Sequence, residues 1–282
     1  MGALDLVSHW PAPQVAAVVV DPNGPGATTG PVAQQFRIAS LSKVLTAWAT
    51  LVAVEEGSID LDAPLPRVAV PSGCTLRHLL AHASGLPFEG DTPIAAVGER
   101  RIYSNTGIER AADAVAVATS MPFADYLTEA VLAPLGMADT AVLGSPAHGV
   151  RSTANDIARF LGEMLRPRLV HRDTVAEAMT AQFADLDGIV PGVGRFTPCP
   201  WGLGMEIHGE KDPHWMGRTN SPSTVGHFGG AGTMMWADPA ADIALVALTD
   251  LPFDQWPGTP VTHWRELSDA VLAEFRPAGS AR

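Results

Sequence analysis

The sequence places a serine and a lysine at a spacing that could make the serine a nucleophile. Ser40 and Lys43 are three residues apart, and this spacing puts both side chains on one face of a helix. A serine hydroxyl attacks a carbonyl when a base takes its proton, and a lysine can be that base when burial lowers its pKa. Arginine cannot replace it, because a guanidinium keeps its proton. On its own the pair is a weak signal, since serine is a common helix cap and lysine a common surface residue.

A second segment carries a phenol and an amide that could assist such a pair. In Tyr103-Ser104-Asn105, the phenol could hold or relay a proton near an ammonium group. The Asn105 amide could orient the carbonyl of a substrate or the lysine. The alternative is purely structural: Asn105-Thr106-Gly107 would form a turn and Tyr103 would be a packing residue.

A third candidate is the glycine-rich segment 226–232, which contains His227, Phe228, Gly229 and Gly230. Glycines at a strand edge let a substrate approach the backbone closely and leave N–H groups free. The alternative is an ordinary glycine-rich hairpin turn in which His227 is a hydrogen-bonded strand residue.

Strands and a helix are predicted around the first candidate pair. The apolar run Val15–Val20 ends in turn formers at 21–26, and residues 34–38 resume an extended pattern. These features predict a hairpin of two strands with a long loop. Apolar residues then recur with helical spacing up to Gly57, which predicts an amphipathic helix opened by Ser40.

The rest of the chain divides into a helical middle and a strand-rich end. Helices are predicted at 76–83, 108–120, 123–132, 155–165 and, near the C-terminus, 263–275. Strands are predicted at 202–208, 224–228, 233–237 and 243–249. The simplest arrangement is an α+β fold in which 1–60 and 195–282 form one antiparallel sheet flanked by helices, and 61–194 is an inserted, mainly helical domain.

Composition excludes several function classes. The chain has 282 residues with a formal net charge of -12, which argues against a nucleic-acid partner because phosphate binding needs a surplus of basic residues. A hydrophobic fraction of 46% excludes disorder. No run of 18 apolar residues predicts a membrane span, and the N-terminal residues lack the pattern of a secretory signal. We therefore expect a cytoplasmic protein.

Neither a metal nor a cofactor is predicted. Cys74 and Cys199 are far apart in sequence and fit no metal or redox spacing, so both are expected to be free, buried thiols. His78 and His82 have a spacing that metal ligands use on helices, but no third ligand accompanies them.

Taken together, the three segments resemble the class C branch of the β-lactamase and penicillin-binding protein superfamily of serine hydrolases. The shared order is Ser-x-x-Lys, Tyr-x-Asn and His-x-Gly. This branch includes D,D-carboxypeptidases, D-aminopeptidases and family VIII esterases. The resemblance runs from about residue 15 to 275 and extends to further blocks at 36–40, 76–87, 103–107, 121–127, 134–137, 152–160 and 201–204. It implies a β-lactamase/transpeptidase-like fold.

The resemblance implies catalytic roles for three side chains and a binding role for a fourth. Ser40 would attack a carbonyl and form an acyl-enzyme that water then resolves. Lys43 and Tyr103 would share the activating proton, with either of them as the formal base. Asn105 would contact the acyl side chain or Lys43.

It also implies roles for the third segment. His227 would take the position that a cation holds in the family, with Phe228 and Gly229 beside it. The backbone N–H groups of Ser40 and Gly230 would form the oxyanion hole.

The third segment also departs from the family pattern. β-Lactamases and many related peptidases have a lysine followed by a hydroxyl residue there, and both bind a substrate carboxylate. His227 is mostly neutral near pH 7, and Phe228 has no hydroxyl. We therefore expect a carboxylesterase or a peptidase- or amidase-like enzyme acting on a small-molecule or peptide substrate. The alternatives are a true β-lactamase or D,D-carboxypeptidase, and a non-catalytic sensor or scaffold.

Overall fold

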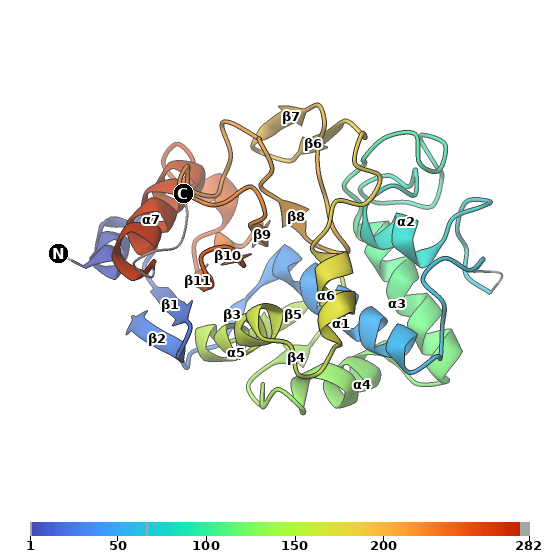
Figure 1. The fold of residues 1–282 in the computed structure, drawn as a ribbon, viewed down its shortest axis with the longest axis horizontal. Coiled ribbons are helices and arrows are strands. Elements are labelled where there is room, and N and C mark those ends of the chain that lie inside the picture. Colours follow the sequence, from blue (N-terminus) through green and yellow to red (C-terminus); the bar gives the residue numbers. More distant parts are fainter. Residues whose placement is uncertain (1, 66, 277–282) are drawn as a thin grey trace.

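The two ends of the chain form a six-stranded antiparallel sheet (Figure 1). The structure is a computed structural model and describes residues 2–65 and 67–276. The strand order is β2-β1-β11-β10-β9-β8. In chain order these strands are β1 (Val15–Asp21), β2 (Gly24–Thr29), β8 (Glu206–Ile207), β9 (Val225–Gly229), β10 (Thr233–Asp238) and β11 (Ile243–Thr249). The prediction of one antiparallel sheet built from both ends is confirmed.

The predicted N-terminal hairpin has a different second strand. Strand β1 pairs with β2, which lies within the segment that was expected to be a loop. From the predicted strand at 34–38, only β3 (Phe36–Arg37) is extended, and it pairs in another sheet. Strand β2 is at the edge of its sheet, and an edge strand tolerates proline and glycine because only one side needs hydrogen bonds.

Strand β1 is buried on both of its faces. Ala16, Val18 and Val20 belong to one apolar core, and Ala17 and Val19 belong to a second core on the other side of the sheet. This alternation follows from the two-residue period of a strand. It explains why the strand is a continuous apolar run instead of a polar–apolar alternation.

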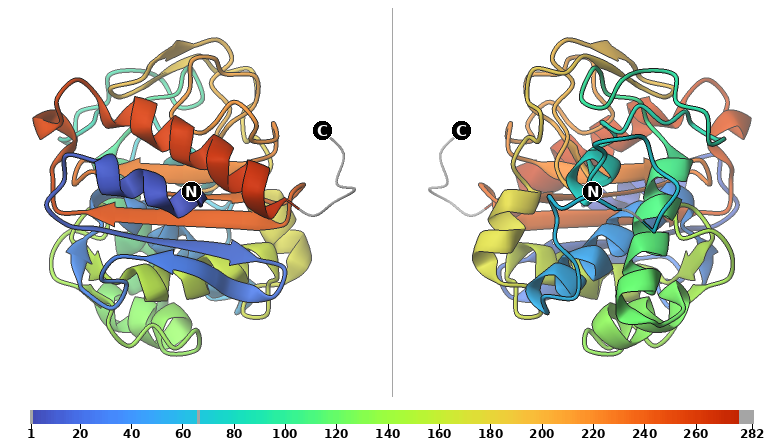
Figure 2. Two further views of the ribbon diagram at one scale, coloured as in Figure 1. Left: turned by 90° about the vertical axis from the view of Figure 1, so that its left-hand side faces the viewer. Right: turned by 90° about the vertical axis from the view of Figure 1, so that its right-hand side faces the viewer.

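Helices cover both faces of the sheet (Figure 2). Helix α7 and the short helix η1 lie on one face, and α5 packs against β1 and β11 on the other. The α-helices are α1 (Ser42–Glu55), α2 (Leu76–Leu80), α3 (Asn105–Thr119), α4 (Phe123–Leu127), α5 (Ala154–Leu165), α6 (Arg172–Ala178) and α7 (Pro260–Phe275). The shorter helical turns are η1 (Ala3–His9), η2 (Ala39–Leu41), η3 (Thr128–Leu132) and η4 (Phe253–Gln255).

Helix α1 differs from the amphipathic helix that was predicted. It begins at Ser42, two residues after Ser40, and every residue from Ser42 to Ala53 is buried. The helix contacts helices α3 and α4 and shares an apolar core with residues of β1 and β11, so its polar side chains are enclosed as well. A lysine in its first turn is therefore held away from water.

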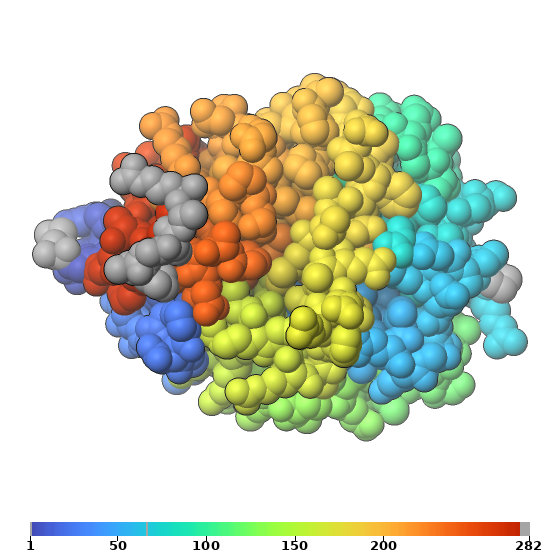
Figure 3. Space-filling view, viewed as in Figure 1, coloured from blue at the N-terminus to red at the C-terminus, as the bar shows by residue number. Residues whose placement is uncertain are grey.

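The middle of the chain lies mainly on the side of the molecule away from the two ends (Figure 3). It contains the small strands β4 (Ala141–Val142), β5 (Val150–Ser152), β6 (Gly188–Val190) and β7 (Gly194–Phe196). The division into 1–60 with 195–282 and an inserted 61–194 stays a prediction, with residues 1, 66 and 277–282 outside the described ranges. Within those ranges, no helix has the length and apolar character needed to cross a membrane. Cys74 and Cys199 are free and buried, as predicted.

Candidate active site

Ser40 lies in the short helical turn η2, directly before helix α1. Ala39, which precedes it, has a positive φ of 46°, a conformation that non-glycine residues adopt mainly at strained sites. The residue that caps α1 is Leu41, which has no side-chain hydrogen bond to the helix. The Ser40 hydroxyl is therefore not used as a helix cap.

The Lys43 amine contacts Ser40 and two oxygens that can only accept hydrogen bonds. Its Nζ lies 3.0 Å from Ser40 Oγ, 2.6 Å from Asn105 Oδ1 and 3.0 Å from the carbonyl oxygen of Ala147. A neutral amine has two N–H donors and one lone pair. Because the amide and carbonyl oxygens take the two donors, the lone pair of a neutral Lys43 points at the Ser40 hydroxyl.

Burial also favours the neutral form of this lysine. Lys43 is completely buried, and burial lowers its pKa to about 7, against the opposing attraction of Glu109. The amine lies 4.8 Å from the centre of the Tyr103 ring. Burial therefore makes the uncharged form of Lys43 accessible near neutral pH.

Tyr103 and His227 meet beside this pair. The Tyr103 hydroxyl lies 3.4 Å from His227 Nε2, and His227 Nδ1 lies 2.7 Å from the Phe228 carbonyl oxygen. A carbonyl oxygen only accepts, so Nδ1 carries the proton and Nε2 presents a lone pair. The Tyr103 O–H group is therefore the donor to His227.

Both side chains are held in their neutral forms. Burial, followed by the nearby Lys43, lowers the pKa of His227 to about 3. Burial raises the pKa of Tyr103 above its ordinary value, although the neighbouring Ser40 hydroxyl acts in the opposite direction. At neutral pH this site therefore contains an uncharged imidazole and an uncharged phenol.

The two glycines after Phe228 have different surroundings. A Cβ on Gly229 would lie 2.7 Å from the Ile38 carbonyl oxygen and 2.6 Å from Thr233 Oγ1. Gly229 thus allows β9 to approach the segment that carries Ser40 closely. A Cβ on Gly230 would meet nothing within 4 Å. In the described part of the chain, the backbone N–H groups of Ser40 and Gly230 donate no hydrogen bond.

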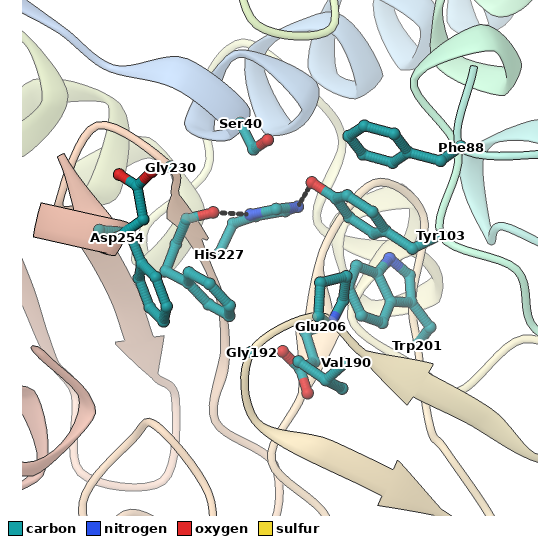
Figure 4. A pocket seen from close by; sticks show the side chains of 13 residues that line it. Ser40, Phe88, Tyr103, Val190, Gly192, Trp201, Glu206, His227, Gly230 and Asp254 are labelled. Carbon is teal, nitrogen blue, oxygen red and sulfur yellow. Dashed lines mark hydrogen bonds between the residues drawn. The ribbon is translucent and has the colours of Figure 1, made fainter. Parts of the chain in front are cut away.

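Ser40 opens into an apolar cavity of about 480 Å³ (Figure 4). Tyr103 and His227 point into it, and its other walls are mostly aromatic or aliphatic. They include Phe88, Val190, Pro191, Trp201, Phe228 and Phe253. The Phe228 ring also packs against Phe253 and Trp264, with ring centres 5.6 and 5.5 Å apart. Phe228 is therefore a wall of the cavity and offers no hydrogen bond to a substrate.

A second cavity of about 550 Å³ shares Ser40, Phe88 and Gly230 with the first, and its more polar lining also includes Asn105. Six of the eight predicted site residues thus line one or both cavities. The other two do not line either cavity. Lys43 is buried and lies within hydrogen-bond distance of Ser40, and Gly229 allows the strand that carries His227 to approach the Ser40 segment.

One buried charged cluster was not predicted. The carboxylate of Glu206, on β8 at the wall of the apolar cavity, accepts hydrogen bonds from Lys211 at 2.6 Å, His214 at 2.8 Å and Trp215 at 2.7 Å. Burial alone raises the pKa of Glu206, but the attraction of Lys211 and His214 outweighs it and holds the pKa below its usual range. Lysine is rare in this chain, and that rarity could have singled out Lys211 but not its partners.

Within residues 2–65 and 67–276, no group of three or more His, Cys, Asp or Glu side chains is arranged to hold a metal ion. The site itself brings together a serine hydroxyl, a buried amine, a phenol and two backbone N–H groups that donate no hydrogen bond in the described structure.

Comparison with known proteins identifies the family of this chain. The family profile described as Beta-lactamase matches residues 12–262. The D-alanyl-D-alanine-carboxypeptidase/endopeptidase AmpH of Escherichia coli (strain K12) is 26% identical over 302 residues, covering 83% of this chain and 74% of AmpH.

Solved structures agree with this assignment. A beta-lactamase from Mycobacterium bovis is 46% identical, with a TM-score of 0.93 and coverage of 98% of this chain and 100% of that one. EstCE1, a hydrolase with promiscuous acyltransferase activity, shares the fold at 16% identity and a TM-score of 0.76, with 95% and 96% of the two chains covered. The predicted β-lactamase/transpeptidase-like fold is confirmed, and the chain belongs to the Beta-lactamase family of serine hydrolases.

Proposed function

We propose that this protein is a serine hydrolase that forms an acyl-enzyme on Ser40 with a small ester or amide, as a carboxylesterase or a peptidase- or amidase-like enzyme. One observation carries the proposal. The only free position on a neutral Lys43 amine faces the Ser40 hydroxyl at 3.0 Å, because Asn105 and Ala147 occupy its two N–H donors. This is the arrangement that an activated nucleophile needs.

In this proposal Lys43 is the general base and Asn105 positions it. The Ser40 proton moves to Lys43 Nζ as the Oγ–carbonyl bond forms. Tyr103, as a neutral phenol, gives its proton to the leaving group as the ester or amide bond breaks, and regains one from Lys43. Water then attacks the acyl-enzyme by the reverse proton transfers.

The carbonyl oxygen would be bound by the N–H groups of Ser40 and Gly230, which have no partner in the described structure. Two such donors stabilise the negative charge that develops on this oxygen in the transition state.

The apolar cavity supports a preference for an uncharged group beside His227. A neutral imidazole and a phenylalanine offer no charge and no hydroxyl to a carboxylate at this position. The second candidate is a β-lactamase or D,D-carboxypeptidase, which is favoured by the relationship to AmpH and to the Mycobacterium bovis beta-lactamase.

A substrate panel tests the proposal. We expect short-chain p-nitrophenyl esters to be hydrolysed with a higher kcat/KM than a chromogenic cephalosporin, and the Ser40→Ala variant to show no activity on either substrate. Faster turnover of the cephalosporin would favour the second candidate, and residual activity in Ser40→Ala would contradict both.

The activity is expected to fall as the pH drops below about 7. Protonation of Lys43, whose pKa is about 7, removes the lone pair that takes the Ser40 proton. For a substrate without ionising groups, kcat/KM should decrease about tenfold per pH unit on the acidic side. The measurement is a pH–rate profile with p-nitrophenyl butyrate. His227→Gln should keep the same acidic limb, because the pKa of His227 is only about 3. A profile that is flat from pH 5.5 to 8 excludes Lys43 as the base.

Adjacent glycines are expected to respond differently to substitution. Gly229→Ala should lower the free energy of unfolding by about 1–3 kcal/mol, because its Cβ collides with the Ile38 carbonyl oxygen. Gly230→Val has open space at its Cβ and should change stability by less than about 0.5 kcal/mol. It should nevertheless reduce kcat about 10²-fold, by blocking access to the oxyanion donor. Urea denaturation and ester kinetics separate the effects, and equal stability of both variants would contradict the close approach of β9.

A further inference from the structure

Two arginines face each other across a strand pair next to Ser40. Arg37 of β3 and Arg151 of β5 are direct partners in the antiparallel ladder, so their side chains project from the same face. Arg37 is exposed, Arg151 is half-buried, and both line the polar cavity that contains Ser40. Only two residues separate Arg37 from Ser40, so the pair lies near the reacting carbonyl.

Neither guanidinium has a carboxylate partner. Of the residues that the structure describes, no Asp or Glu lies within ion-pair distance of Arg37 or Arg151, although the same cavity includes Glu89 and Asp250. Asp250 instead accepts a hydrogen bond from the backbone N–H of Gln14. Among the described residues, the two side chains make one hydrogen bond, from Arg151 Nη2 to the Gln35 carbonyl oxygen at 3.3 Å.

Like charges placed directly opposite each other on a sheet repel. The repulsion is unusual in a chain with a net charge of -12, in which acidic partners are abundant. A carboxylate placed between the two guanidiniums would remove it, since the planar arginine fork binds both oxygens of a carboxylate.

We propose that Arg37 and Arg151 form a subsite for a carboxylate carried by the substrate. The proposal rests on the proposed function, because it assigns the substrate class of the same serine. The two cavities then divide the substrate: an uncharged apolar group lies on the His227 side, and an acidic group lies on the Arg37–Arg151 side. Recognition of a carboxylate, which the third segment does not offer, is then provided by the polar cavity that also contains Ser40.

Matched esters test the proposal and locate the carboxylate. The first pair is mono-p-nitrophenyl glutarate and its methyl ester, with the acid on the acyl part. The second pair is 4-carboxyphenyl butyrate and its methyl ester, with the acid on the leaving group. We expect one acidic ester to exceed its neutral partner in kcat/KM. Arg37→Gln and Arg151→Gln should each lower that acid-to-neutral ratio by about tenfold to a hundredfold.

Arg172→Gln is the matched control. Arg172 is exposed and lines neither cavity, and its substitution removes the same charge as the two test variants. Its acid-to-neutral ratio should equal that of the wild type. An equal ratio in Arg37→Gln and Arg151→Gln would overturn the subsite, as would the same fall in the Arg172→Gln control.

Binding keeps the subsite testable if the proposed hydrolase activity fails. Calorimetry of the Ser40→Ala protein should show binding of monomethyl glutarate, and adding Arg37→Gln should weaken this binding about tenfold. Dimethyl glutarate should bind the Ser40→Ala protein more weakly, and its affinity should not change when Arg37→Gln is added. Absence of ester hydrolysis together with this binding pattern would contradict the function and support the subsite. Equal binding of the two glutarates would overturn the subsite alone.

Discussion

Replacing Lys43 by methionine is expected to lower kcat/KM for p-nitrophenyl butyrate by about 10²–10⁴-fold, the usual contribution of a general base. Methionine fills a similar volume but has no lone pair of amine basicity to take the Ser40 proton. Lys43→Arg should be similarly inactive, because a guanidinium stays protonated. The measurement is steady-state kinetics on both purified variants.

Thermal melts separate loss of catalysis from loss of fold. Lys43 is completely buried. The larger and permanently charged arginine can therefore also destabilise the fold, whereas methionine removes the amine with little change in volume. If folded Lys43→Met keeps more than about a tenth of the wild-type kcat/KM, Lys43 is not the base. Tyr103 would then be the remaining candidate, and Tyr103→Phe would identify it.

Replacing Lys211 by methionine is expected to lower the free energy of unfolding more than any other substitution proposed for this protein. Lys211 and Glu206 have exposed side-chain fractions of 2% and 1%, so the substitution leaves a carboxylate buried with its main counter-charge removed. Loss of one partner of such a pair costs about 3–5 kcal/mol. Urea denaturation should show this loss of free energy of unfolding, and a thermal melt should show a decrease in Tm of about 10 °C.

A second substitution distinguishes charge from packing. Glu206→Gln in the Lys211→Met background removes the uncompensated charge, and we expect it to restore at least half of the lost free energy of unfolding. The one side-chain oxygen of glutamine can still accept from His214, whereas Trp215, which donates to the other carboxylate oxygen, loses its acceptor, so the recovery should be incomplete. A Lys211→Met protein within about 1 kcal/mol of the wild type would contradict the role assigned to this cluster.

Local patterns were sufficient to predict most of the elements around the site. The strands that became β10 and β11 are largely apolar runs, β9 adjoins a glycine-rich turn, and helices α3, α5 and α7 follow helical spacing. The eight candidate site residues were predicted from three short segments, each a weak signal alone, because their order along the chain resembles that of a known family. The contacts of Ser40, Lys43 and Asn105 agree with that prediction.

The misassigned elements depend on long-range packing. Strand β2 contains glycine and proline, which locally favour turns, and it is extended because β1 provides one hydrogen-bonded edge. Helix α1 was expected to have a polar face, yet it is enclosed on all sides by segments distant in sequence. No local period indicates such burial.

The unpredicted charged groups have the same origin. Arg37 and Arg151 are 114 positions apart and meet only because β3 pairs with β5. Glu206 and Lys211 are close in sequence, but a spacing of five residues in an irregular segment does not indicate an ion pair. These pairings require the tertiary structure.

The most direct test of the central claim is the mass of the intact protein after exposure to a fluorophosphonate. We predict a single adduct that peptide mapping places on Ser40, formed faster as the pH rises through 7, much slower in Lys43→Met and absent from Ser40→Ala. An unmodified Ser40, or an adduct on any other residue, would contradict the assignment of Ser40 as the nucleophile.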